Sequence, residues 1–239
     1  MWDNHRLLNG IATGLYLVSG GLIAYAALIF VINLPIFPLR EVEVTGRMTH
    51  TTRDQVHGVV TGQFSGNFFT LNLEHARSAF EKLPWVRTAN VRRQWPDRLT
   101  VEVEEHVAVA RWRDIALVDT YGDVFEAATD ETLPTFIAPD GTSMEVAQRY
   151  AAFQKLLQPL GKFPVQIVLS ERRAWQIKLN DGDLLQLGRE QMDDRLQRFV
   201  YAYSRTLAAL PSRTYRIDLR YPNGFAVRGG AAIIKTHGA

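Results

Sequence analysis

The chain opens with a long uninterrupted run of apolar residues. From Leu7 to Leu39, 33 consecutive positions carry no charged side chain. An α-helix rises about 1.5 Å per residue, so about 20 residues cross a hydrocarbon layer about 30 Å thick. Ile11 to Ile32 alone supplies 22 residues, and Pro35 ends the run. The pattern therefore predicts a single transmembrane helix over residues 7–34, preceded by a short tail of residues 1–6.

A cleaved signal peptide is the alternative interpretation of this segment. Ala24-Tyr25-Ala26 fits an A-x-A cleavage pattern. The apolar stretch of a signal peptide is only about 7–15 residues long, whereas this one continues as far as Ile32. We therefore favour an uncleaved anchor. Its orientation stays open on charge alone, because Arg6 and Arg40 flank the helix on its two sides.

Beyond Pro38 the apolar positions change their period and outline a first polar unit. Alternation over Leu39–Val44 is typical of a half-buried strand, and Thr52–Gln55 has the spacing of a helix capping box. A second helical period ends at Pro84, and two alternating strands follow it. We expect a β-α-α-β-β unit within residues 38–106, with two helices packed on a three-stranded sheet.

A second unit, residues 107–230, combines short strands with two helical segments. Thr142–Glu145 has the spacing of a helix start, and Asp181-Gly182 and Pro222-Asn223-Gly224 are hairpin turn signals. Strands that follow one another in series favour a largely antiparallel sheet with both helices packed on it. We expect residues 231–239 to form a C-terminal tail. The chain as a whole is expected to be an α+β protein.

The average composition excludes several classes of protein. The 239 residues include 27 Lys and Arg, 25 Asp and Glu, and no cysteine. A disordered chain, a collagen and a disulfide scaffold are all excluded. A net charge of +2 does not favour nucleic-acid binding, which usually requires a strong basic excess.

The polar body shows no motif typical of an enzyme or a metal site. The six histidines have no metal-ligand spacing, and neither a Walker A loop nor a G-x-G-x-x-G motif occurs. Glu102 and Glu104 lie on the solvated face of a strand. Arg87, Arg92 and Arg93 lie on the preceding strand, where we expect them to pair with such carboxylates. We therefore expect no catalytic residue, metal, cofactor or small-molecule substrate.

The last hairpin is the strongest candidate for a binding surface. Arg220-Tyr221-Pro222-Asn223-Gly224-Phe225 closes it. A terminal strand often forms a sheet edge, whose unpaired N–H and C=O groups can accept a partner strand. Arginine and tyrosine are also enriched at binding hot spots. From the residues alone, an ordinary hairpin with a polar turn would explain the segment equally well.

Several longer motifs resemble those of one family. In the first unit, Leu83-Pro84-Trp85-Val86, Val91–Leu99 and Val101–Glu105 resemble the FtsQ-type POTRA pattern of bacterial cell-division proteins. The resemblance continues in the same order through most of the chain. Its further motifs are Ala110-Arg111-Trp112, Leu117-Val118-Asp119 with Gly122, Trp175-Gln176, Leu187-Gly188-Arg189, Arg195-Leu196, Arg198-Phe199, and Ile217–Tyr221 with Asn223-Gly224.

The resemblance implies a non-enzymatic, single-pass type II protein of the bacterial inner membrane. Residues 1–6 would be cytoplasmic, and a POTRA domain and a larger β domain would lie in the periplasm, at the division septum. Such proteins link early and late division proteins. Their β domain binds FtsB and FtsL, and the POTRA domain would recruit other division proteins.

The same resemblance assigns partner-binding roles to particular residues. Arg220, Tyr221, Asn223 and Gly224, with the adjoining Phe225, fall on the family's partner-binding last-strand region. Arg173 matches a second basic position of that region.

The chain departs from the family pattern at two points. The tail before the membrane helix is shorter than usual, which makes a cytoplasmic contact through it doubtful, and Ala108 replaces a common proline. The alternative function is a POTRA-bearing component of an outer-membrane assembly or secretion system. Such proteins continue into a large β-barrel, whereas only some 130 residues follow the first unit here, and two of their elements are helical.

Overall fold

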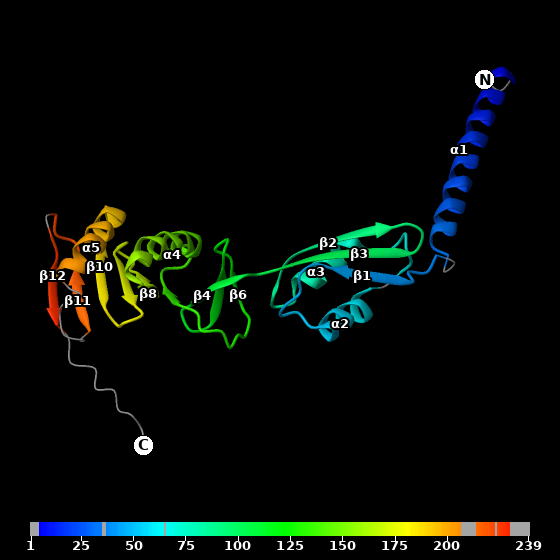
Figure 1. The fold of residues 1–239 in the computed structure, drawn as a ribbon. Helices are drawn as coiled ribbons and strands as arrows, with labels where there is room; N and C mark the ends of the chain where they lie inside the picture. The colour runs from blue at the N-terminus through cyan, green and yellow to red at the C-terminus, as the bar shows by residue number, and fades with distance from the viewer. Residues whose placement is uncertain (1–4, 35–36, 65, 207–213, 223, 230–239) are drawn as a thin grey trace. The chain divides into compact units, whose positions relative to one another are not determined.

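The computed structural model describes residues 5–34, 37–64, 66–206, 214–222 and 224–229. It divides the chain into two compact units, residues 1–105 and 106–239. Most of the predicted tails, residues 1–4 and 231–239, lie outside the described residues, as does Pro35. Each unit is an independent combination of helices and strands (Figure 1), so the two are described separately.

The first element is the apolar helix α1, His5–Ile32. Within the described residues it is the one helix long and apolar enough to cross a membrane, over Asn9–Ile32, and none of that stretch is buried against the protein. The helix ends two residues before the predicted limit. There the Leu34 amide donates to the Val31 carbonyl at 3.1 Å, a three-residue turn that closes the last coil.

The rest of the first unit has the predicted β-α-α-β-β order. Its elements are β1 (Glu41–Thr45), α2 (Arg53–Gln63), α3 (Leu73–Glu81), β2 (Val86–Gln94) and β3 (Arg98–Glu105). Among the described residues, β3 is the central strand, parallel to β1 and antiparallel to β2. The capping box predicted at Thr52 and Gln55 is formed at the start of α2.

Alternation along β3 builds the core of this unit. Leu99, Val101 and Val103 are buried and face the helices, whereas Glu102 and Glu104 face solvent. Phe80 of α3 is fully buried against the same apolar side. Burying such side chains stabilises the fold by about 1.5–3 kcal/mol each.

The second unit is built around a long mixed sheet. Among the described residues its strands lie in the order β12-β11-β10-β9-β8-β7-β4-β5-β6. The bounds are β4 (Ala108–Trp112), β5 (Ala116–Asp119), β6 (Val124–Phe125), β7 (Thr135–Ile137), β8 (Pro164–Leu169), β9 (Trp175–Leu179), β10 (Leu184–Gly188), β11 (Tyr215–Asp218) and β12 (Ala226–Gly229).

The predicted antiparallel character of this sheet is confirmed for most of its pairings. Parallel pairing joins β4 to β7, β7 to β8, and β10 to β11, and the remaining described neighbours are antiparallel. Parallel pairs need crossover connections. Helices provide them for two of the pairs: α4 (Ser143–Leu157) with its 3-10 extension lies between β7 and β8, and α5 (Met192–Thr206) lies between β10 and β11.

The helices cover one face of this sheet. Phe153 of α4 and Phe199 of α5 share a core with inward-facing strand residues such as Ile167, Ile177 and Ile217. One expectation at α4 was wrong: the Thr142 side chain makes no cap hydrogen bond and instead donates to the Pro139 carbonyl at 2.6 Å. The preceding loop offers the hydroxyl a nearer acceptor than the helix start does.

Candidate partner-binding edge of the second unit

Strand β12 forms one edge of the long sheet. It pairs with β11, and among the described residues no strand pairs with its other side. Strand β11 is attached to the sheet by parallel pairing with β10, which the Leu219 amide extends by donating to the Gln186 carbonyl at 2.9 Å. An edge of this kind presents backbone N–H and C=O groups to a further strand.

Arg220, two residues after the end of β11, is fixed by the carboxylate of Asp218, the last residue of that strand. Its Nε and Nη2 donate to the two oxygens of Asp218 at 2.8 and 2.6 Å. These bonds hold the pKa of the Asp218 carboxyl below its ordinary value. The Arg220 side chain is 61 % exposed, and among the described residues its Nη1 has no hydrogen-bond partner. It can therefore still donate to a carboxylate from outside.

A glycine makes room for this arginine. Gly188, at the end of β10, has a φ of +79°, and a Cβ there would lie 3.1 Å from Cγ of Arg220 and 2.8 Å from Nη1 of Arg195. A positive φ and this close approach both favour glycine. The Arg195 guanidinium in turn donates to the Leu187 carbonyl at 2.6 Å. The end of β10 thus orients both arginines.

The other predicted residues of the last hairpin have different environments. Tyr221 is 54 % exposed, as a contact residue should be. Phe225 is half-buried, and its ring lies edge-on to Phe199 of α5 with centroids 6.3 Å apart, so it anchors the hairpin. Gly224 is exposed, with open space where a Cβ would be. Asn223 lies outside the described residues.

Arg173 lies in the turn between β8 and β9, at the same end of the sheet as Arg220. Trp175 at the start of β9 is opposite Gly188 at the end of β10, and β11 runs parallel to β10. Two strand spacings separate β9 from β11, or about 10 Å. Arg173 has a φ of +64°, and its Nη2 contacts both oxygens of Glu145 at 2.6 Å. Like Arg220, it is held by an internal carboxylate.

A buried ammonium group, which the sequence analysis did not single out, fixes the last strands. Lys162 is 7 % exposed and contacts the carboxylates of Asp181 and Asp183, the latter at 3.0 Å. Burial opposes its charge, but these carboxylates and Tyr203 together raise its pKa. Asp183 also accepts from the Tyr215 amide at 2.9 Å, so the first residue of β11 is tied to this group.

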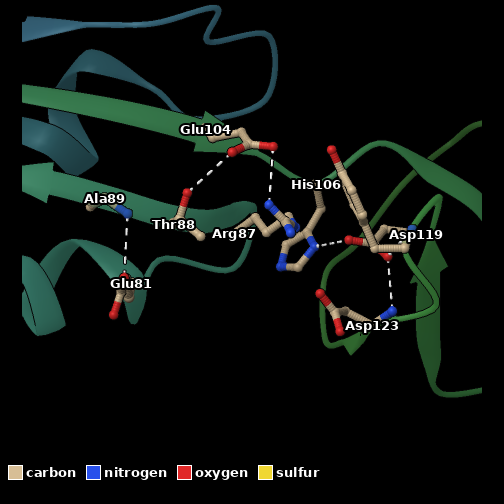
Figure 2. A network of polar contacts seen from close by, with 9 residues as sticks. Glu81, Arg87, Thr88, Ala89, Glu104, His106, Asp119 and Asp123 are labelled. Carbon is tan, nitrogen blue, oxygen red and sulfur yellow. Dashed lines mark hydrogen bonds and ion pairs between the residues drawn. The ribbon is translucent and has the colours of Figure 1, made fainter. Parts of the chain in front are cut away.

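The carboxylates and arginines of the first unit are used mainly for cross-strand pairing. Arg87 contacts Glu104 at 3.1 Å, as Figure 2 shows, and Arg92 contacts Glu102 at 3.2 Å. These pairings confirm the prediction. For Arg93 it was wrong: this side chain donates to the carbonyls of Phe68, Phe69 and Leu71. The loop before α3 needs a donor, and Arg93 is within its reach.

A second polar cluster unforeseen from the sequence lies at the start of the second unit. Nδ1 of His106 and Oδ2 of Asp119 are 2.8 Å apart (Figure 2). Asp119 is fully buried, and its other oxygen accepts from the Tyr121 and Asp123 amides at 2.8 Å. An aspartate before Thr120-Tyr121-Gly122 is a turn signal in the sequence. The cluster therefore organises a turn. In the described part of the chain, no group of three or more potential metal ligands occurs.

Comparisons with known proteins agree with this arrangement of units. Residues 37–106 match the POTRA domain, FtsQ-type, and residues 110–220 match the family described as cell division protein FtsQ/DivIB, C-terminal.

Full-length relatives extend these matches along almost the whole chain. The chain is 46 % identical over 234 residues to a cell division protein FtsQ of Nitrosospira multiformis, an alignment that covers 96 % of this chain and 99 % of that protein. It is 41 % identical over 242 residues to the cell division protein FtsQ of Burkholderia pseudomallei, with 95 % and 94 % covered. The chain therefore belongs to the FtsQ/DivIB family of cell division proteins.

Proposed function

We propose that this protein is a non-enzymatic scaffold of the divisome that links early and late division proteins at the septum. In this proposal residues 107–230 bind FtsB and FtsL, and residues 38–106 recruit other division proteins. The alternative, a component of outer-membrane assembly, lacks support from the matched relatives, which carry the name of a cell division protein. The single observation that carries the proposal is the open β12 edge beside Arg220 and Tyr221.

The chemistry of that edge suits an added strand. Backbone groups of β12 that pair with no described strand supply affinity without requiring a particular sequence, whereas side chains beside the edge supply specificity. Arg220 offers a guanidinium already oriented by Asp218, so little rotamer entropy is lost when it binds a carboxylate. Tyr221 adds an exposed ring with few rotatable bonds. Arg173, at the same end of the sheet, is the second basic contact in this proposal.

The orientation in the membrane belongs to the same proposal. Helix α1 places one end of the chain on each side of the inner membrane, and we place residues 1–6 in the cytoplasm and both folded units in the periplasm. A fluorescent fusion of the full chain should gather at the division septum. An even distribution round the cell envelope would contradict the septal role.

The partner site is tested by a double substitution, Arg220→Glu with Tyr221→Ala. Charge reversal repels the partner carboxylate and truncation removes the ring, so capture of FtsB should fall to background. The matched control is Arg189→Glu with Tyr201→Ala, which changes an exposed arginine and an exposed tyrosine outside the last hairpin. Both variants should remain folded by circular dichroism and remain in the membrane fraction. Undiminished capture of FtsB by the first variant would exclude the proposed site.

A further inference from the structure

The sheet face opposite the helices carries basic side chains in one row. In β9, β10 and β11, the inward positions Ile177, Leu185 and Ile217 are buried under the helices. Because side chains alternate along a strand, the flanking Lys178 and Arg216 point to the other face. Both are exposed.

The strand registers bring these cations into line. Lys178 is opposite Leu184 across β9 and β10, Leu184 is opposite Arg216 across β10 and β11, and Arg216 is opposite Arg228 across β11 and β12. Register partners in neighbouring strands share one face, with Cβ atoms about 5 Å apart. The row therefore runs across four strands and reaches the open edge of the sheet at Arg228.

The pairing of Arg216 with Arg228 is electrostatically unfavourable. Like charges directly opposite each other in an antiparallel pair destabilise it. In the first unit, by contrast, Arg87 and Arg92 pair with glutamates. Among the described residues, Lys178, Arg216 and Arg228 make no ion pair with any carboxylate. This stretch of sheet therefore has an uncompensated positive charge.

The same residues line an open hollow. Its volume is about 520 Å³, and its lining includes Lys178, Leu184, Thr214, Arg216, Arg228 and Gly229. The three cations surround one apolar side chain, Leu184, which is half-buried. A ligand that fits such a surface is a short peptide segment with acidic side chains and a small apolar contact.

We propose that Lys178, Arg216 and Arg228 form a binding surface for acidic side chains of the partner segment that adds to β12. A strand added there would lie about 4.8 Å beyond β12, with every second side chain on the face of Arg228. An Asp or Glu directly opposite Arg228 would then neutralise the Arg216–Arg228 pair, since both guanidinium groups can reach it. The inference rests on the proposed function, because it requires a partner strand at β12.

The test uses a double variant that carries both Arg216→Gln and Arg228→Gln, and compares it with the unchanged chain. The full chain is placed in nanodiscs of zwitterionic lipid, and the periplasmic parts of FtsB and FtsL serve as the probe. We expect the affinity of the double variant to fall about ten-fold at low salt. We also expect its affinity to vary less with salt, because fewer charges are neutralised on binding. Its thermal unfolding temperature should stay the same or rise, since a like-charge pair is removed.

The control variant removes the same charge elsewhere in the unit. Lys155→Gln with Arg205→Gln changes cations on α4 and α5, the helices that cover the opposite face. It should bind with the affinity and salt dependence of the unchanged chain. If the double variant at 216 and 228 behaves like this control, the inference is wrong. The proposed function still stands in that case, provided that Arg220→Glu with Tyr221→Ala abolishes binding.

A lipid headgroup could offer similar negative charge, so vesicles provide a second arm. Binding to vesicles with and without phosphatidylglycerol is measured for the unchanged chain and for the double variant at positions 216 and 228. If Arg216→Gln with Arg228→Gln removes vesicle binding and leaves the affinity for FtsB and FtsL unchanged, the surface faces lipid and the inference is overturned. Loss of affinity for the protein partner with unchanged vesicle binding supports it.

Discussion

At the scale of single residues, the position of the last strands depends on one buried ammonium group. Lys162 contacts Asp181 and Asp183, and Asp183 also accepts from the Tyr215 amide of β11. The Lys162 ammonium lies 4.3 Å from the centroid of the Tyr203 ring of α5 as well. The turn between β9 and β10, helix α5 and strand β11 are therefore linked through the Lys162 ammonium and its carboxylate partners.

Replacing Lys162 by Met should destabilise the second unit by about 3 kcal/mol, because removal of one partner leaves Asp183 buried without its counter-charge. The measurement is urea unfolding followed by tryptophan fluorescence. Lys155→Met, at an exposed position of α4, is the control and should change stability by less than about 0.5 kcal/mol. Equal effects of the two substitutions would contradict the role given to Lys162.

At the scale of elements, the end of β3 is joined to the loop before α2 by one carboxylate. Glu105 is 6 % exposed at its side chain and accepts from the amides of Thr49, His50 and Thr51 at 2.6–3.2 Å. Burial alone would raise its pKa, but these donors, with the Thr51 hydroxyl, lower it below the ordinary 4.5. The charged form is therefore the one that stabilises the fold.

Because the pKa of Glu105 is lowered in the folded state, its contribution is complete above about pH 4.5 and is lost as pH falls through the folded value. Glu105→Gln should cost about 2 kcal/mol at pH 7. The difference in unfolding free energy between the two proteins should then narrow below pH 4.5, as measured by urea titrations at a series of pH values. Glu102→Gln, in an exposed pair, is the control and should have little effect at any pH. A difference that stays constant with pH would contradict this account.

The elements themselves follow closely from the periodicity of the sequence. Thr52 and Gln55 form the expected capping box, and the Asp181-Gly182 turn joins β9 to β10 with Gly182 at a φ of +94°. The side-chain cap expected at Thr142 does not form, because its hydroxyl donates to the Pro139 carbonyl instead. Strand β4 was not predicted, because Ala108–Trp112 does not alternate regularly between apolar and polar residues. Local sequence patterns therefore predicted most of the helices and strands, but not which of two possible hydrogen-bond partners a side chain such as Thr142 contacts.

At the scale of the whole molecule, we expect the apolar N-terminal helix α1 to attach the two folded units to the membrane. Deleting residues 2–34 should move the protein from the membrane fraction to the soluble fraction, because these residues supply the membrane-spanning length. Cell fractionation measures this directly. Restoring an unrelated single-pass helix should return the protein to the membrane. Persistence of the deleted form in membranes would contradict a single anchor.

The sequence by itself determined the anchor, the β-α-α-β-β order and the family, because these depend on local periodicity and on motifs read along the chain. Only the tertiary structure decided which side chains meet. Parallel pairing of β10 with β11 brings Gly188 against Arg220 and lines up Leu184, Arg216 and Arg228. Lys162 likewise contacts Asp183, which lies 21 positions further along the sequence. Such contacts depend on strand order and register, which periodicity within one strand does not specify.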